Sequence, residues 1–502
     1  MGEVVIDEEH GFAEIPLHDD DHNNQCRPTK SPEDLESNID PPNSSRINVN
    51  GFQIDQQKNP HEDWLPITES RNGNFYTCVF HLLSSGIGMQ ALFLPIAFAT
   101  LGWAWGTITL SVAFVWQLYT IWLLVQLHES VPGIRYSRYL HLSIAAFGPK
   151  LGKLLSLFPV MYLSGGSCVM LIISGGGTMR LFYRLMCSGG TTCEDKSLTG
   201  AEWFLVFTCM AIVLAQRPNL NSVAGLSFVG AITALCYCTL IWALSIVKGR
   251  PSDVSYGPRE EPDSDIEGFS NVLIAIGMIV LAFRGHNLVL EIQGTLPSSP
   301  TKASKKPMWR GVTVSYALIA LSLFPLAIAG YWVYGNKVPA DYMPKGGLLT
   351  GFVQHHGHTT SKFVKGLIYM LIIINSLCSY QIYAMPVFDN LEMRYISSKN
   401  RQCPWWVRTG FRICFGGISY LVAVAFPFLG RLAALIGGIT LPLTYAYPCF
   451  MWILIKKPRP NSAMWCINLL LGCLGMILAV LLILAASWNL HDQGVNGNFF
   501  KP

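Results

Sequence analysis

Charged residues are scarce in this sequence. Of its 502 residues only 13% are Asp, Glu, Lys or Arg, whereas 51% are hydrophobic. An ordinary soluble protein is roughly 25% charged, so this composition excludes a single soluble globule. The basic residues stand singly between apolar runs rather than on one stripe, and we therefore expect no nucleic-acid partner.

The sequence also lacks the motifs of several enzyme classes. It contains no His-Glu-x-x-His zinc motif, no Gly-x-Ser-x-Gly nucleophile elbow and no glycine-rich phosphate loop. We therefore expect no enzyme, no metal site and no cofactor. The N-terminus has no basic segment followed by an apolar run, which excludes a cleaved signal peptide.

The charges that are present divide the chain into two parts. Residues 1–70 carry 16 acidic and 4 basic residues, a net charge of −12, and the remaining residues carry 15 acidic and 31 basic residues, a net charge of +16. The acidic part is rich in Pro, Asn, Ser and Asp and cannot bury enough apolar area to offset chain ordering. We expect residues 1–72 to form a disordered cytoplasmic tail, either a solvated spacer or a regulatory or trafficking segment.

Long apolar runs fill the rest of the chain. About 20 apolar residues cross the hydrocarbon core of a bilayer as a helix. Windows of that length predict an all-α membrane protein with eleven spans, at residues 75–100, 105–127, 155–178, 201–216, 223–247, 270–294, 311–335, 363–387, 409–428, 432–455 and 464–488. Residues 73–488 are thus predicted to be the membrane domain, and residues 489–502 a short extracellular tail.

The loop charges predict the orientation of this domain. If the N-terminus is inside, the cytoplasmic loops contain 17 Lys and Arg residues and the outer loops contain 12. This moderate excess favours a cytoplasmic N-terminus. Most of the 14 cysteines fall within spans, but Cys187 and Cys193 lie in a predicted outer loop. Gly189 and Gly190 permit a turn between them, so we regard these two as a candidate disulfide.

Polar and glycine residues interrupt two of the spans at membrane depth. The interruption of the first span comprises Ser84, Ser85, Gly86, Ile87 and Gly88, with His81 one turn earlier. The interruption of the sixth span comprises Phe283, Arg284 and Gly285, followed by His286, Asn287 and Glu291. Lipid cannot satisfy exposed backbone or charge, so these groups are expected to face protein or a water-filled cavity.

The two interruptions are five spans apart, as expected if spans 1–5 and 6–10 form an inverted repeat. Interrupted helices at corresponding positions indicate a substrate site at the interface of the repeats. Structural alternatives exist for both segments. The glycines of the first span are also suited to close helix packing, and Arg284 and Glu291 could form a buried packing pair.

Several motifs together resemble one family. They lie at residues 81–95, 101–103, 127–129, 138–139, 146–148, 285–293 and 330–336, and at Pro448 and Trp452. With these motifs the chain resembles the amino acid/auxin permease family, and within it the plant lysine/histidine transporter-like branch, over residues 76–488. The resemblance implies a LeuT-like fold of five plus five helices, with helices 1 and 6 discontinuous and an eleventh helix added. It also implies proton-coupled uptake of amino acids across the plasma membrane.

The sequence departs from the family pattern at the expected site. Relatives typically have Gly-Ala-Gly in the first span where this chain has Gly88-Met89-Gln90, and often have a small residue where this chain has Arg284. Lysine and histidine are therefore not carried over as substrates. We hypothesise that Arg284 disfavours cationic side chains and favours neutral or acidic substrates.

The chemistry of an α-amino acid suggests roles for the two interruptions. A substrate carboxylate is expected at N–H groups freed near Ser85 to Gly88, where the helix dipole favours an anion. Freed carbonyls of the first span and of Phe283 to Gly285 would accept the ammonium protons, and Phe283 is either a hydrophobic gate or a packing aromatic. The predicted substrate-binding residues are Ser84, Ser85, Gly86, Ile87, Gly88, Phe283, Arg284 and Gly285.

Proton coupling requires a titratable group at membrane depth, and the candidates are Glu291 first, then His286 and His81. Sodium coupling is the rival, with oxygens from Asn375, Ser376 and Ser379 on one face of the eighth span. A sensor that binds an amino acid without transporting it is the third hypothesis. The expected partners are an amino acid, a proton and the lipid bilayer, and the sequence leaves the oligomeric state open.

Overall fold

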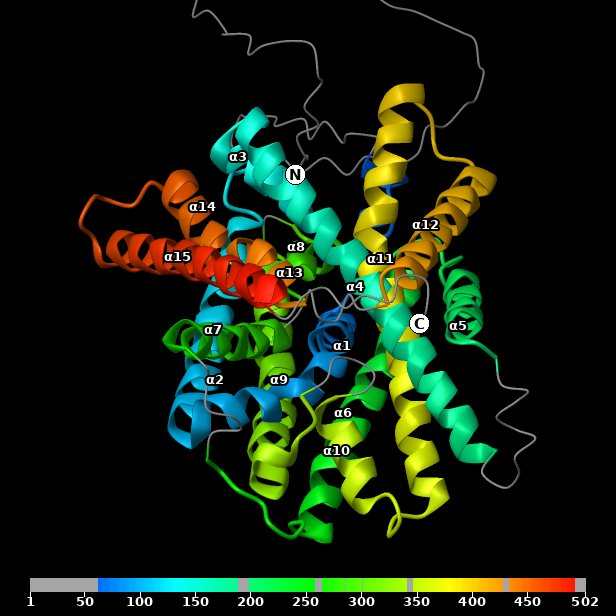
Figure 1. Cartoon of the computed structure of the whole chain (residues 1–502). Coiled ribbons are helices and arrows are strands. Elements are labelled where there is room, and N and C mark those ends of the chain that lie inside the picture. Colours follow the sequence, from blue (N-terminus) through cyan, green and yellow to red (C-terminus); the bar gives the residue numbers. More distant parts are fainter. Residues whose placement is uncertain are drawn as a thin grey trace, which may run out of the picture.

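A computed structural model describes residues 62–187, 198–257, 264–283, 285–299, 301–340, 346–427 and 433–492. Within these residues nine helices are long and apolar enough to cross a membrane, and α5, Gly200–Leu214, is a shorter apolar helix. The helices pack into one bundle (Figure 1). The chain is therefore a multi-pass membrane protein, which confirms the prediction from its composition.

The first five predicted spans correspond to the helices of the first half. These are α1 (Phe75–Gly86), the short helix η2 (Met89–Phe93), α2 (Leu94–Leu127), α4 (Pro149–Met186), α5 and α6 (Ala224–Lys248). Gly102, with a φ of 74°, bends α2 at the point where the first span ends and the second begins. A positive φ suits glycine because glycine has no Cβ.

The second half repeats this order and adds the eleventh helix. Its helices are α7 (Asp265–Ala282), η5 (His286–Leu288), α8 (Val289–Gly294), α9 (Lys305–Tyr334), α11 (Lys362–Lys399), α12 (Trp405–Ala425), α13 (Ala433–Leu441), α14 (Tyr447–Lys456) and α15 (Ala463–Asp492). A π-helical turn, Pro442–Ala446, joins α13 to α14. The last helix, α15, packs against α13 and α7.

Two helices were not predicted from the sequence. They are α3 (Tyr139–Phe147) and α10 (Gly347–His356), of 9 and 10 residues. Both are shorter than the roughly 20 residues that a span requires, so a search for spans does not find them. They lie at opposite ends of the bundle (Figure 1), and α3 packs against α4 and α14.

The surface of the bundle is apolar. Large aliphatic side chains on the spans, such as Leu154, Val213 and Leu321, are about 70% exposed. Such exposed apolar side chains are suited to contact with lipid. Inside the bundle small residues allow close approach: a Cβ on Gly175 of α4 would lie only 2.2 Å from the ring of Phe207 on α5.

Candidate functional site

The first span is interrupted as predicted, between α1 and η2. Helix α1 ends at Gly86, and Ile87 and Gly88 are both extended. Gly88 occupies the N-cap position of η2 and offers no side chain to its first N–H groups. These N–H groups at Met89 and beyond thus begin a second half-helix at membrane depth.

Side chains of α11 hold the carbonyls at the end of α1. The Ser379 hydroxyl donates to the Ser84 carbonyl at 2.8 Å, and the Tyr383 hydroxyl donates to the Ser85 carbonyl at 2.7 Å. The Ser85 hydroxyl donates back to the His81 carbonyl. Because these carbonyls have no helical donor after the break, α11 satisfies them within the bundle.

The sixth span is interrupted at the corresponding place. Helix α7 ends at Ala282, Phe283 is extended, and Gly285 is left-handed with a φ of 89°. Arg284, the predicted selectivity residue, lies outside the described residues. The two interruptions touch, because a Cβ on Gly285 would lie 2.8 Å from the Ser85 Oγ atom. The structure thus brings Ser85 and Gly285 together.

We expect Gly285→Ala to impair strongly the transport that the family resemblance implies. An alanine there adopts a left-handed conformation that costs about 1–2 kcal/mol, and its Cβ meets the Ser85 hydroxyl. Radiolabelled uptake should fall by about tenfold at equal surface abundance. Gly165→Ala on α4 is the matched control, because a Cβ there meets nothing within 4 Å. Equal uptake by the two variants would contradict the expectation.

A cavity of about 40 Å³ lies beside the break of the sixth span. Its walls come from α4, the sixth-span interruption, α11 and the turn between α13 and α14. Among the lining residues are Phe283, Gly285, His286, Asn287, Tyr383 and Tyr445. A cavity of this size has room for a small number of water molecules. The side chains must therefore move apart before an amino acid enters.

The three proton-coupling candidates occupy different surroundings. Both ring nitrogens of His286 lack a hydrogen-bond partner among the described residues, and this ring lines the cavity. His81 instead pairs its Nδ1 atom with the Ser227 hydroxyl of α6 at 2.7 Å. Glu291 is 3% exposed, and its Oε1 atom accepts from the backbone N–H of Tyr139 at 3.5 Å. Only His286 of the three faces the cavity.

The residues considered for sodium coupling are largely engaged with neighbouring carbonyls. The Asn375 side chain donates to the Gly230 carbonyl at 3.0 Å, and Ser379 donates to Ser84 as described above. The Ser376 hydroxyl is buried and has no partner among the described residues. Asn375 and Ser379 thus each hold a neighbouring helix through a side-chain donor.

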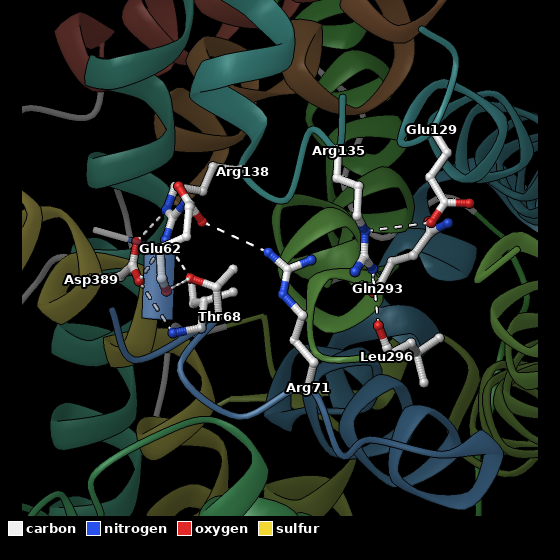
Figure 2. A network of polar contacts seen from close by, with 10 residues as sticks. Glu62, Thr68, Arg71, Glu129, Arg135, Arg138, Gln293, Leu296 and Asp389 are labelled. Carbon is white, nitrogen blue, oxygen red and sulfur yellow. Dashed lines mark hydrogen bonds and ion pairs between the residues drawn. The ribbon is translucent and has the colours of Figure 1, made fainter. Parts of the chain in front are cut away.

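A second group of polar residues lies at the end of the bundle that carries α3. Residues 62–71, which we call the N-terminal strap, cross this end before α1 begins. Figure 2 shows Arg138, at the N-cap of α3, pointing toward Glu62 of the strap and Asp389 of α11. Its guanidinium binds Asp389 through two hydrogen bonds of 2.5 and 3.2 Å and Glu62 at 3.2 Å.

Other contacts hold the strap along its length. Arg138 also donates to the Thr68 hydroxyl, and the Ile67 N–H donates to the Asp389 carboxylate at 3.2 Å. Arg408 of α12 donates to the Trp64 carbonyl at 2.8 Å. The strap is therefore joined to α3, α11 and α12.

Burial and charge oppose each other in the pKa values of this group. Burial alone would raise the pKa of Glu62, but Arg138 and His141 outweigh it, and the pKa falls below the ordinary value. Burial would lower the pKa of Arg138, yet the carboxylates of Asp389 and Glu62 raise it. Both ions of the Glu62–Arg138 pair thus stay charged at neutral pH.

Arg135 joins the loop between α2 and α3 to the end of the sixth span. Arg135 donates to the Leu296 carbonyl at 2.9 Å and lies 3.5 Å from the Glu129 carboxylate, as Figure 2 shows. Glu129 also accepts from the Ser304 hydroxyl at 2.7 Å. Residues 128–139 therefore connect the end of α8 with the strap.

The predicted disulfide falls at the edge of the described residues. Cys187, at the C-cap of α4, is disulfide-bonded. Its predicted partner Cys193 lies outside the described residues, so the pairing of the two stays a prediction. Among the described residues no cluster of three or more His, Cys, Asp or Glu is arranged to hold a metal ion.

The sequence reasoning missed the part of the site that α11, α13 and the π-helical turn Pro442–Ala446 supply. Tyr383, Thr440 and Tyr445 line the cavity, and none of them was predicted. A signal for Tyr445 was present, because Pro442 and Pro448 bracket the short segment of the tenth span that contains it. Prolines interrupt helical hydrogen bonding, so their spacing indicates an irregular turn near the site.

Comparison with known proteins agrees with this architecture. Residues 71–488 match the model of the family described as transmembrane amino acid transporter protein. The chain is 50% identical over 444 residues to Lysine histidine transporter-like 8 of Arabidopsis thaliana, which covers 88% of this chain and 84% of the relative. It is also 50% identical over 446 residues to Lysine histidine transporter-like 7 of the same plant, which covers 88% and 90%.

A solved structure shares the fold. It is a Na+-coupled sialic acid symporter in a substrate-bound outward-open state, with a TM-score of 0.51 and 12% sequence identity. The match covers 87% of this chain and 93% of that chain. The likeness confirms the LeuT-like arrangement expected from the sequence. Because the sequence identity is only 12%, it shows the fold alone.

Proposed function

Because the chain belongs to the family of transmembrane amino acid transporter proteins, we propose that it imports amino acids across the plasma membrane by proton-coupled symport. The observation that supports this most is the contact between the two interrupted spans at Ser85 and Gly285. Broken helices that meet at mid-depth supply backbone groups for a zwitterion where lipid supplies none. The cycle is alternating access around this point.

The substrate backbone binds at the two breaks in this proposal. The carboxylate accepts from the N–H groups that begin η2, where the half-helix dipole favours an anion. The ammonium group donates to carbonyls of Ser84 and Ser85, each of which has a second lone pair beside its α11 donor. The side chain extends into the cavity that Phe283 and His286 line. For Arg284, which lies outside the described residues, we keep the hypothesis that it disfavours substrates with cationic side chains.

Glu291 is the proposed proton carrier. It is a buried carboxylate with one oxygen that has no hydrogen-bond partner among the described residues, and it lies one turn beyond the break of the sixth span. Protonation removes the cost of an uncompensated buried charge. The resemblance to the amino acid/auxin permease family favours protons over sodium in this proposal.

The orientation is also part of the proposal. The acidic tail, residues 1–72, and the strap at its end lie on the cytoplasmic side, and residues 489–502 lie outside. The ion pairs of Arg138 then close the cytoplasmic end of the bundle while the substrate site faces outward.

Uptake by transport-deficient cells tests these proposals. Each of the twenty amino acids is offered in radiolabelled form, with external pH and sodium varied independently. We expect concentrative uptake of neutral or acidic amino acids that increases at acidic external pH and does not change when choline replaces sodium. Binding without uptake would support a sensor instead, and uptake that requires sodium would contradict proton coupling. Strong competition by lysine would contradict the role of Arg284.

A further inference from the structure

One carbonyl near the cavity has lost its helical donor. In the π-helical turn between α13 and α14, the Tyr447 N–H donates to the Pro442 carbonyl, five residues earlier. With the same spacing, the N–H donor for the Leu443 carbonyl would come from residue 448. That residue is a proline and has no N–H. The Leu443 carbonyl must therefore find a donor outside its own helix.

Tyr139 supplies that donor from α3. Its hydroxyl donates to the Leu443 carbonyl at 2.8 Å, and its ring is 1% exposed. Thr440, Leu441, Thr444 and Tyr445, on both sides of Leu443, line the cavity. The position of the Tyr139 hydroxyl thus determines where this wall of the cavity lies.

The backbone of the same residue contacts Glu291. Tyr139 is the first residue of α3, so its N–H has no partner within the helix. It donates to the Glu291 Oε1 atom at 3.5 Å. One residue therefore binds the proposed proton carrier with its main chain and the cavity wall with its side chain.

We infer that Tyr139 is a positioning residue that couples the protonation of Glu291 to the affinity of the cavity for substrate. The inference rests on the proposed function, because it assumes that Glu291 carries the proton. An ionised Glu291 accepts the Tyr139 N–H, and a protonated one accepts it more weakly. The start of α3 then shifts, and the Leu443 carbonyl follows the hydroxyl that holds it.

Other charged and titratable groups act on the same place. Arg138 of the adjoining loop and Asp389 of α11 interact electrostatically with the Glu291 carboxylate. Tyr447 and Cys449 of α14 interact electrostatically with Tyr139. Arg138 precedes Tyr139 in the chain and binds the strap. A shift at the start of α3 therefore also reaches the residues that close the cytoplasmic end.

Tyr139→Phe tests the link, because it removes the hydroxyl and keeps the ring and the N–H. The measurement is the KM of the best substrate at external pH 5.5 and 7.5 in the full-length transporter. We expect the ratio of the KM at pH 7.5 to the KM at pH 5.5 to be about 2- to 10-fold closer to one than in the wild type. This is the effect expected from the loss of one hydrogen bond. The maximal rate at pH 5.5 should stay within about twofold of the wild type, since the proposed proton and substrate groups are intact.

Two further variants make the test specific. Pro448→Ala in the Tyr139→Phe background returns an N–H that can reach the Leu443 carbonyl, and the wild-type ratio should return with it. Tyr136→Phe is the control, because it removes a tyrosine hydroxyl from the same segment and leaves the Tyr139 bond to the Leu443 carbonyl in place. A wild-type ratio in Tyr139→Phe, an equal loss of uptake at both pH values, or a double variant that does not recover would each overturn the inference.

Failure of the proposed function gives a different result. If the wild-type KM and maximal rate do not change with external pH, then proton coupling itself is wrong, and the inference falls with it. If the wild type depends on pH and only the Tyr139 variants disagree, the proposed function stands without this link.

Discussion

Replacing Glu291 by glutamine is expected to abolish the dependence of uptake on external pH. Glutamine keeps the shape of the side chain and can still accept the Tyr139 N–H, but it cannot take up or release a proton. The variant should resemble a permanently protonated carrier, which exchanges substrate across the membrane without accumulating it. Concentrative uptake under an imposed pH gradient should fall by about 100-fold or more, the scale expected when an essential proton-transfer group is lost.

The matched measurements separate coupling from folding. Exchange of preloaded radiolabelled substrate should persist in Glu291→Gln at near the wild-type rate, which shows that the variant is folded and binds substrate. His286→Gln is the comparison, because His286 lines the cavity and Glu291 does not. If Glu291→Gln retains the pH profile of the wild type while His286→Gln loses it, the proton site is His286 and our assignment is wrong.

The spans and the two interruptions could be predicted because membranes restrict what a sequence can do. Only a helix satisfies its own backbone in lipid, so an apolar window of span length predicts one. Polar groups such as Ser85 and Glu291 are conspicuous against that background. The eleven predicted spans accordingly correspond to the helices of the structure, although α4 runs eight residues past the end of its predicted span.

The parts that could not be predicted depend on contacts between distant segments. The strap carries an ordinary polar sequence, and only its position against Arg138 and Asp389 gives Glu62 a role. Tyr139 looks like the first residue of a short loop helix, and its importance comes from a carbonyl about 300 residues away in the chain. Single-sequence patterns report the periodicity of one segment and contain no information about such partners.

Asp389→Asn is expected to open the end of the bundle that the strap crosses, which is the cytoplasmic end in our proposal. Arg138 and Asp389 are 3% and 1% exposed in the closed arrangement. Removing one member of a buried ion pair costs about 3–5 kcal/mol when the other charge is left uncompensated, and Glu62, which still pairs with Arg138, offsets part of this cost. An open arrangement hydrates Arg138 and avoids this cost. The equilibrium between closed and open states should therefore shift toward the open state.

Labelling of a cysteine in the strap measures this shift. Leu65 is 3% exposed, so a Leu65→Cys variant should react slowly with an impermeant maleimide in inside-out vesicles. Addition of Asp389→Asn should raise the labelling rate by at least about tenfold, the effect of 1.4 kcal/mol. The external KM should rise as well, because fewer transporters present the site outward.

Two further variants test whether the loss of the Asp389 charge causes the increase in the labelling rate. Thr68→Val removes the hydrogen bond from the Arg138 guanidinium to an uncharged hydroxyl at 3.3 Å without removing a charge and should raise the rate only about 2- to 5-fold. Asp265→Asn, which neutralises an exposed carboxylate at the start of α7, should leave it unchanged.

The pH dependence of the same labelling has a definite sign. Because the pKa of Glu62 is lowered in the folded protein, its stabilisation of the closed strap is complete above the unfolded pKa of about 4.3. It is lost only as the pH falls through the lower folded value. The labelling rate of Leu65→Cys, divided at each pH by the rate of the same cysteine in the unfolded chain to correct for the thiolate fraction, should thus be flat between pH 6 and 8 and increase only under strong acid. A steep increase near neutral pH would show that a group other than Glu62 controls the strap.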